Sequence, residues 1–150
     1  MPLTPSKKLT VLEANIDDMN PEWYEPLMDR LFQSGALDVT LHPIIMKKGR
    51  PAVMVSVLTD KAKKESLANV LFEESTTLGV RSYEVERFET RRETKVVKTA
   101  HGPVTVKIGR NAGGKVINIA PEYESCRQLA RKRHIPIKEV YQSAIKASTF

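Results

Sequence analysis

Residues 9–22, LTVLEANIDDMNPE, join a strand pattern directly to the start of a helix. Leu12, Ala14 and Ile16 alternate with their neighbours, and this period of two predicts a strand with one buried face. Asn20 is a good N-cap residue and Pro21 suits the first helical position, so a helix is expected to follow at once. Asp17 and Asp18 lie between the two elements. They could hold a metal ion, or they could only cap a turn or a helix.

The rest of the first 90 residues extends this pattern into an α+β unit. Apolar residues recur at helical spacing after Pro21, and Gly35 is a natural stop. They are Trp23, Tyr24, Leu27, Met28, Leu31 and Phe32. Strands are expected at 37–46, 51–59 and 80–89, with Pro43 favouring a sheet edge. Asp60 is expected to cap a helix over 61–76. The order is β-α-β-β-α-β, which is typical of the ferredoxin-like fold.

A second, smaller pattern fills residues 91–150. A β-hairpin is expected at 94–100 and 103–109, and a further strand at 115–120 follows the turn signal NAGG. Two helices should follow, the first opened by Pro121 and Glu122 and the second by Pro136. We therefore predict a ferredoxin-like subdomain at 1–90. A β-hairpin/strand plus two-helix subdomain should follow at 91–150.

Composition narrows the class of protein. The chain has 150 residues, of which 41% are hydrophobic, enough to build a core. It lacks the run of about 18 apolar residues that a membrane span needs. One cysteine, Cys126, cannot form an internal disulfide, which favours a cytoplasmic protein, and its apolar helix face favours the core. The net charge of +6 favours anionic partners, namely nucleic acid, nucleotides or other phosphates.

The predicted topology gathers charged residues at one sheet edge. In a ferredoxin-like sheet the first two strands run parallel, and the third and fourth run the opposite way. The end of the first strand, the turn between the second and third, and the start of the fourth then share one edge. These three places carry Asp17 and Asp18, then Lys47, Lys48, Gly49 and Arg50, and then Thr77, Gly79 and Arg81.

Carboxylates facing several cations favour a metal–polyphosphate site. Mg²⁺ and Mn²⁺ take hard oxygen ligands and often complete their shell with phosphate oxygens. Lysine offers phosphate a point charge, arginine offers a two-pronged donor, and Gly49 allows close backbone approach. The alternatives are that the aspartates cap turns or form surface ion pairs, and that KKGR is only a polar hairpin turn.

Arg91 and Arg92 fall near the join of the two predicted subdomains. They could line a phosphate cleft there, or they could simply pair with Glu89 and Glu93. No catalytic residue is assigned, since the sequence has no P-loop, no GxGxxG and no Ser/His/Asp pattern. The three histidines and Cys126 also lack the spacing of a zinc site.

Five motifs in order resemble the C-terminal half of the LarC family, nickel insertion proteins for the nickel-pincer cofactor of lactate racemase. They are NIDDMNPE (15–22), GALDV (35–39), MKKGRP (46–51), LFEESTTLGVR (71–81) and APEYESC (120–126). The resemblance implies a nickel chelatase that places Ni²⁺ into pyridinium-3,5-bisthiocarboxylic acid mononucleotide. It also implies CTP hydrolysis with Mn²⁺ or Mg²⁺, with CTP bound by the C-terminal half. By position it points to the aspartates of IDDMN, the basic residues of KKGRP and the TTLGVR segment.

The family resemblance also sets limits. Family members are usually much longer, so the pyridinium mononucleotide is expected to bind through an N-terminal half that this chain lacks. The chain is therefore not expected to insert nickel alone. One rival is a basic nucleic-acid-binding module, but strands 9–16 and 51–59 lack the stacking aromatics of an RNA-recognition sheet. The other is an assembly domain without chemistry, and exposed sheet edges make a homo-oligomer plausible.

Overall fold

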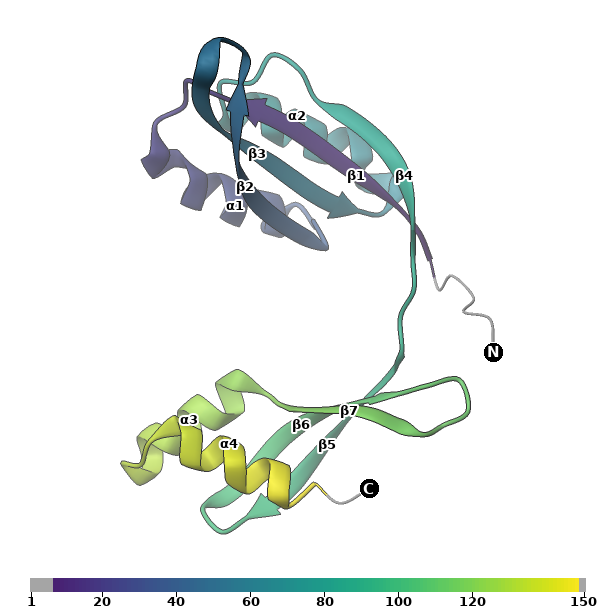
Figure 1. Cartoon of the computed structure of the whole chain (residues 1–150), viewed down its shortest axis with the longest axis vertical. Coiled ribbons are helices and arrows are strands. Elements are labelled where there is room, and N and C mark those ends of the chain that lie inside the picture. The colour runs from purple at the N-terminus through teal and green to yellow at the C-terminus, as the bar shows by residue number, and fades with distance from the viewer. Residues whose placement is uncertain (1–6, 149–150) are drawn as a thin grey trace. The chain divides into compact units, whose positions relative to one another are not determined.

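The computed structural model describes residues 7–148, and the chain divides into two compact units, Met1–Phe88 and Glu89–Phe150. The described residues form a mixed α+β fold with two antiparallel sheets and four α-helices (Figure 1). None of the helices in this range has the length and hydropathy that a membrane span requires.

The first unit is a four-stranded sheet with two α-helices. Its sheet order is β2-β3-β1-β4, and every neighbouring pair is antiparallel. The prediction that Pro43 marks an edge strand is confirmed, because β2 lies at one end of this sheet. The elements are β1 (Lys7–Ile16), η1 (Pro21–Trp23), α1 (Tyr24–Gln33), β2 (Asp38–Met46), η2 (Lys47–Gly49), β3 (Arg50–Thr59), η3 (Lys61–Lys63), α2 (Lys64–Glu74) and β4 (Arg81–Arg87).

Strand alternation gives the sheet one buried face and one open face. Leu12, Ala14 and Ile16 of β1 are buried in one cluster with residues of β3, α1 and α2, as their spacing predicts. Both helices therefore cover the same face, as Figure 1 shows. The odd-numbered residues of β1 lie on the other face, where Glu13 stands opposite Ser56 of β3 and Arg81 of β4.

Both predicted cap residues stand at the start of their helical regions, but only the first makes a side-chain cap bond. The Asn20 side chain accepts a hydrogen bond from the backbone N–H of Glu22 at 3.1 Å, so the predicted cap is confirmed. Asp60 occupies the cap position without a side-chain cap bond, because its carboxylate pairs with Lys7 at 2.6 Å. Trp23 and Phe32, expected on the apolar stripe, are 49% and 45% exposed, since only Leu27 and Leu31 of α1 reach full burial.

The second unit has its own three-stranded antiparallel sheet, of order β5-β6-β7. Residues of β6 and of both helices share one core that includes Val106, Ile108 and Val140. Cys126 lies in that core, as predicted, and burial raises the pKa of its thiol. The elements are β5 (Arg91–Thr99), β6 (Gly102–Arg110), β7 (Val116–Pro121), α3 (Tyr123–Arg133) and α4 (Ile137–Lys146).

Candidate functional site

Asp17 and Asp18 lie in the bend directly after β1, and their side chains reach different loops. Asp17 Oδ2 accepts a hydrogen bond from Arg50 Nη1 at 2.9 Å, at the start of β3. Asp18 Oδ1 accepts one from Thr76 Oγ1 at 2.5 Å, in the loop between α2 and β4. The two carboxylates thus connect the end of β1 to both of the neighbouring loops that the topology places at this edge.

The environment of Asp17 keeps its carboxyl group ionised. The hydrogen bond from Arg50 is the main cause that lowers the pKa of Asp17 below its ordinary value, while partial burial opposes it. The charges of Arg50 and Lys47 lower this pKa further, which places Lys47 within electrostatic reach of Asp17. Burial and then the charge of Asp18 raise the pKa of Tyr24, at the start of α1.

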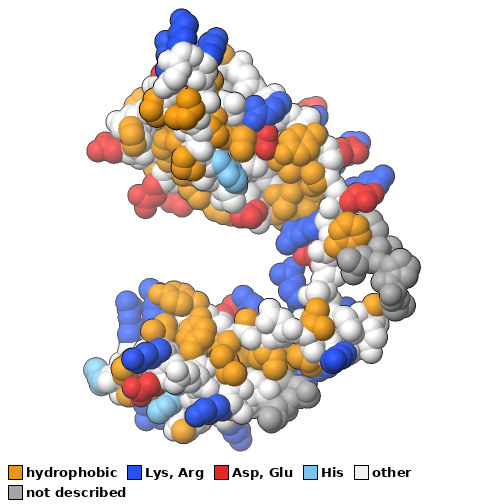
Figure 2. Space-filling view, in the orientation of Figure 1, with side chains coloured by type: hydrophobic (Ala, Val, Ile, Leu, Met, Phe, Trp, Pro, Cys, Tyr) orange, Lys and Arg blue, Asp and Glu red, His pale blue; other side chains and the backbone are white. Residues whose placement is uncertain are grey.

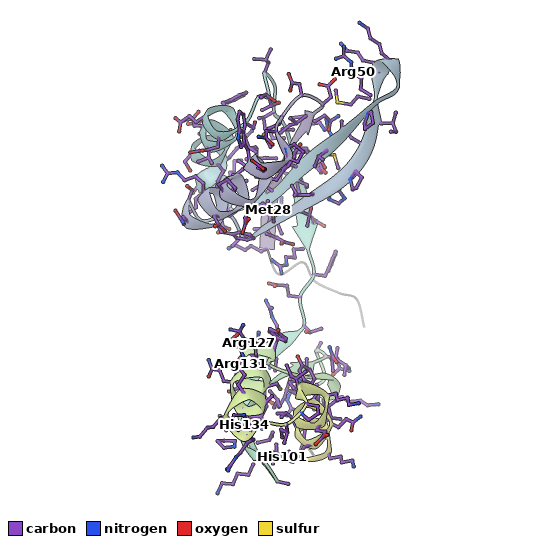
Figure 3. All side chains as sticks on the ribbon, turned by 90° about the vertical axis from the view of Figure 1, so that its left-hand side faces the viewer. Met28, Arg50, His101, Arg127, Arg131 and His134 are labelled. Carbon is purple, nitrogen blue, oxygen red and sulfur yellow. The ribbon has the colours of Figure 1, made fainter. Side chains whose placement is uncertain are left out.

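The turn between β2 and β3 presents two lysines beside this edge. Lys48 and Gly49 have left-handed φ values of 64° and 69°, so the chain reverses sharply over Lys47–Gly49. Lys47 and Lys48 are exposed, and neither has an ion pair or hydrogen bond with any of residues 7–148. Figure 2 shows Lys and Arg side chains gathered at this tip, and Figure 3 places Arg50 there.

The loop between α2 and β4 is held by its own hydroxyl groups. Thr77 is buried, and its Oγ1 donates to the Gly79 carbonyl at 3.0 Å, so it shapes the loop and is not presented to a ligand. The residue that reaches the edge is Thr76, which the sequence reasoning did not single out. The adjacent pair Thr76 and Thr77 could have indicated it. Successive residues of an extended segment point in opposite directions, so if one threonine faces the loop interior the other faces the edge.

Arg81 is engaged on the open face of the sheet. Its Nε donates to Glu13 Oε2 at 2.8 Å, and its Nη2 donates to Asn15 Oδ1 at 3.1 Å and to the Met54 sulfur at 3.0 Å. The Tyr83 hydroxyl donates to the other oxygen of Glu13 at 2.8 Å. That bond, followed by those from Arg81, lowers the pKa of Glu13. Alternation along β1 could have found this cluster, since Glu13 and Asn15 share a face.

Arg91 and Arg92 belong to the second unit, where they begin β5. Arg92 Nη2 donates to Glu89 Oε1 at 2.8 Å, which is the pairing that the sequence left open as the alternative to a phosphate cleft. Glu93 instead pairs with Arg110, at 2.7 Å and 2.8 Å. The assignment of Arg91 and Arg92 to nucleotide binding stays a prediction.

The carboxylates at this edge suit a divalent metal that is also coordinated by the phosphates of a bound ligand. Within residues 7–148 no group of three or more His, Cys, Asp and Glu side chains is placed to hold a metal ion. Asp17 and Asp18 supply hard oxygens but no third protein ligand. Mg²⁺ and Mn²⁺ are often held by one or two carboxylates together with substrate phosphates and water, and the residues fit that arrangement.

A hollow near this edge has the wrong charge for phosphate. It is lined by Trp23, Pro26, Glu73, Glu74 and Ser75, at the start of α1 and the end of α2. Its lining has two carboxylates and no cation, so it would repel a nucleotide's phosphates. The cationic tip at Lys47, Lys48 and Arg50 is the part of this unit that attracts them.

Comparisons with known proteins agree with one another. The family model described as "Nickel insertion protein" matches residues 3–141. The pyridinium-3,5-bisthiocarboxylic acid mononucleotide nickel insertion protein of a Thermotoga species (strain RQ2) is 46% identical over 137 residues, 91% of this chain and 34% of its own. The protein of the same name from Clostridium acetobutylicum is 46% identical over 136 residues, 91% of this chain and 32% of its own.

A solved structure matches almost the whole fold. It is described as LarC2, the C-terminal domain of a cyclometallase involved in the synthesis of the NPN cofactor of lactate racemase. It aligns with a TM-score of 0.89 and 38% identity, over 94% of this chain and 96% of that one. A Methanopyrus kandleri protein shares the fold, with a TM-score of 0.69 at 23% identity, over 93% of this chain and 85% of its own. The chain spans about a third of the length of the curated relatives that it matches.

Proposed function

The chain belongs to the nickel insertion protein family, and on that premise we propose that it is the CTP-binding part of a nickel insertase. The nucleotide binds with Mn²⁺ or Mg²⁺ at the edge formed by the end of β1, the β2–β3 turn and the α2–β4 loop. The whole enzyme places Ni²⁺, its cargo, into pyridinium-3,5-bisthiocarboxylic acid mononucleotide. CTP hydrolysis is coupled to that insertion.

One observation carries the proposal. Two carboxylates and three cations belong to one sheet edge, and two of those cations, Lys47 and Lys48, are exposed and have no ion pair or hydrogen bond with any of residues 7–148. A turn that serves only to reverse the chain has no need of three cations. A triphosphate does, because each lysine or arginine neutralises part of its charge.

The residues divide the work by their chemistry. Lys47, Lys48 and Arg50 neutralise phosphate oxygens, and Gly49 lets the backbone approach them closely. Asp17 and Asp18 hold the metal, directly or through water. When bound, a divalent ion neutralises phosphate charge and polarises the bond to be cut. Arg50 pairs with Asp17 when no ligand is bound. Its guanidinium can therefore exchange the carboxylate for a neighbouring phosphate oxygen with little movement.

Nickel chemistry needs ligands that this chain supplies poorly. Ni²⁺ favours imidazole and thiolate, whereas this sequence has three histidines and one buried cysteine. We therefore assign nickel binding to the whole protein and nucleotide binding to this chain. Three further points stay predictions. They are the ferredoxin-like fold, which the strand order β2-β3-β1-β4 supports, the cytoplasmic location, and self-association through sheet edges.

Calorimetric titration tests the proposal. CTP and ATP are each titrated into the 150-residue chain, with Mn²⁺ and without it. Metal-dependent binding that prefers CTP is the expected result, and an Arg50→Gln variant should bind at least about tenfold more weakly. Lys61→Gln is the matched control, because Lys61 pairs with Glu84 at 3.1 Å on another part of this unit. If neither nucleotide binds to the folded chain, the proposal is wrong.

A further inference from the structure

The positive charge of the chain is concentrated in its second unit. Thirteen of the 24 lysines and arginines lie in residues 89–150, against five of the 18 aspartates and glutamates. The second unit therefore carries a formal charge of +8, whereas the first carries −2, and together they give the +6 of the chain. The proposed nucleotide site lies in the first unit, so it leaves this excess in the second unit unexplained.

A groove in the second unit combines this charge with apolar surface. It is shallow and widely open to solvent, with a volume of about 650 Å³. Residues of α3, the turn after it and the first residue of α4 line it. They include Tyr123, Arg127, Arg131, His134, Ile135 and Ile137, and no acidic residue.

The polar lining follows one face of a single helix. Tyr123, Arg127 and Arg131 are spaced four residues apart on α3, so their side chains stand along the same side. His134 ends the row, and Figure 3 shows Arg127, Arg131 and His134 following one another along this side. Ile135 and Ile137 supply the apolar part of the groove.

The aromatic end of the groove offers the Tyr123 ring to a planar aromatic partner. The Arg127 guanidinium carbon lies 6.0 Å from the centre of the Tyr123 ring, and its Nη2 donates to Glu124 Oε1 at 2.9 Å. Tyr123 is 60% exposed, so much of the ring is open to solvent. The Nε of Arg127 is buried and has no hydrogen-bond partner within residues 7–148, so this wall has more donors than acceptors.

The opposite end of the groove lies at the start of α4, whose first turn also carries the carboxylate of Glu139, and the Glu139 N–H already donates to the Pro136 carbonyl at 3.0 Å. Ile137, the first residue of α4, lines the groove, and the cap residue Pro136 provides no side-chain hydrogen bond to the helix start. The first turn of a helix presents N–H groups that favour an anion. An anion in this groove would therefore meet Arg131 and His134 first, and the start of α4 only beyond them.

We propose that this groove binds the phosphate monoester of a heteroaromatic mononucleotide, with the ring beside Tyr123 and the phosphate at Arg131 and His134. Arg131 offers the charged donors for a phosphate monoester, whose charge is about −1.5 to −2 at neutral pH, while Arg127 stays paired with Glu124 at the ring end. A triphosphate with its metal would also need carboxylates, and the groove lining has none. The identification of this ligand as the pyridinium mononucleotide substrate rests on the proposed function, and it gives this chain a share in substrate binding.

Titration with nicotinic acid mononucleotide, a pyridinium mononucleotide, tests the inference on the whole chain. Arg131→Gln is expected to weaken its binding by about tenfold, because one charge-assisted phosphate contact is lost. Lys132→Gln removes the same charge from the next residue, which does not line the groove, and should change the affinity by less than about twofold. Tyr123→Ala should weaken binding of the mononucleotide but not of ribose 5-phosphate, which has no ring.

Other outcomes would overturn the inference. One is that the mononucleotide does not bind, and another is that Arg131→Gln and Lys132→Gln lose the same affinity for it. A third is that metal-free CTP at equal concentration displaces the mononucleotide. The last is that single-stranded RNA binds more strongly than the mononucleotide and is equally sensitive to Arg131→Gln. The two proposals fail separately. Arg50→Gln should weaken only CTP with Mn²⁺, and Arg131→Gln only the mononucleotide, so either site can be absent while the other is present.

Discussion

Asp17 and Asp18 are adjacent in sequence but hold different partners. Asp17 pairs with Arg50 and Asp18 accepts a hydrogen bond from Thr76, so each connects β1 to a separate loop. From the sequence, both aspartates could be either metal ligands or structural groups. The contacts show that each has a structural partner in the free chain, so a variant has to separate loss of a hydrogen bond from loss of a carboxylate.

Asp18→Ala should weaken Mn²⁺-dependent binding of CTP by at least about tenfold, because it removes a proposed metal ligand. It should also lower the free energy of unfolding by about 1 kcal/mol through the lost hydrogen bond. Calorimetry and urea denaturation measure the two effects. Thr76→Val is the matched control, since it removes the same hydrogen bond and keeps the carboxylate. Equal losses of CTP affinity in both variants would show that Asp18 acts only as a structural group.

The Glu13 cluster should make the stability of the first unit depend on acid pH. The pKa of Glu13 is lowered in the folded chain, chiefly by the hydrogen bond from Tyr83, so the ionised form is favoured on folding. Its contribution is complete above the ordinary glutamate pKa, about 4.3. It is lost as the pH falls from there through the lowered folded value.

Urea denaturation of the wild type and of Glu13→Gln between pH 2 and pH 7 checks this dependence. The variant should have a lower free energy of unfolding than the wild type at pH 7, and this difference in unfolding free energy should become smaller as the pH falls. Glu86→Gln, a substitution on the neighbouring strand β4, serves as the control. A gap that stays constant down to pH 2 would mean that ionised Glu13 adds no stability.

At the scale of elements, strands and helices could be predicted because their signals are local. Alternation in β1, the Asn20 cap and the edge position of β2 follow from residues within one element and are confirmed. Asp60 takes the predicted cap position without a cap bond, and Trp23 is half exposed, because tertiary contacts decide both. Lys7 takes the Asp60 carboxylate, and α1 has room in the core for only part of its apolar stripe.

The turn between β2 and β3 depends on a left-handed glycine. Gly49 has a φ of 69°, and nothing lies within 4 Å of a Cβ added there, so Gly49→Ala costs only backbone strain. We expect a loss of about 1–2 kcal/mol in unfolding free energy. Gly79→Ala is the control, because Gly79 also has open space around it but no positive φ. Chemical denaturation of both variants makes the comparison, and equal stability would show that the turn adapts without strain.

Part of the candidate site was within reach of topology, and part was not. Strand order brings the end of β1, the start of β3 and the end of α2 to one edge, so the meeting of Asp17, Asp18 and Arg50 there could be predicted. The direction of the side chains was not predicted. Arg81 was expected at the edge but contacts Glu13 on the open face of the sheet, and Thr76 was missed. A contact between loops depends on single rotamers, which topology does not fix.

At the scale of the whole molecule, two units have separate cores and opposite net charge. The core of the first unit is built from β1, β3, α1 and α2, and the core of the second from its own strands and helices. The formal charge of the chain, taken as one number, hides the difference between −2 and +8. Because each unit buries its own apolar residues, we expect each to unfold without the other.

Leu31→Ala tests that independence. Leu31 is fully buried in the first unit, so its truncation should cost about 2–5 kcal/mol there. Native-state hydrogen exchange should then show reduced protection for amides of residues 7–88 and unchanged protection for residues 89–148. Val140→Ala, in the core of the second unit, should give the reverse pattern. Loss of protection in both units with either variant would mean that they unfold together.

The most direct test of the central claim is to locate a bound Mn²⁺–CTP complex by its effect on amide NMR signals. Mn²⁺ broadens the signals of nuclei near it, and Mg²⁺–CTP provides the diamagnetic reference. The account predicts selective broadening at the end of β1, in the turn over Lys47–Gly49 and in the loop that contains Thr76. Broadening confined to residues 89–148, or no broadening in a chain that remains folded, would contradict it.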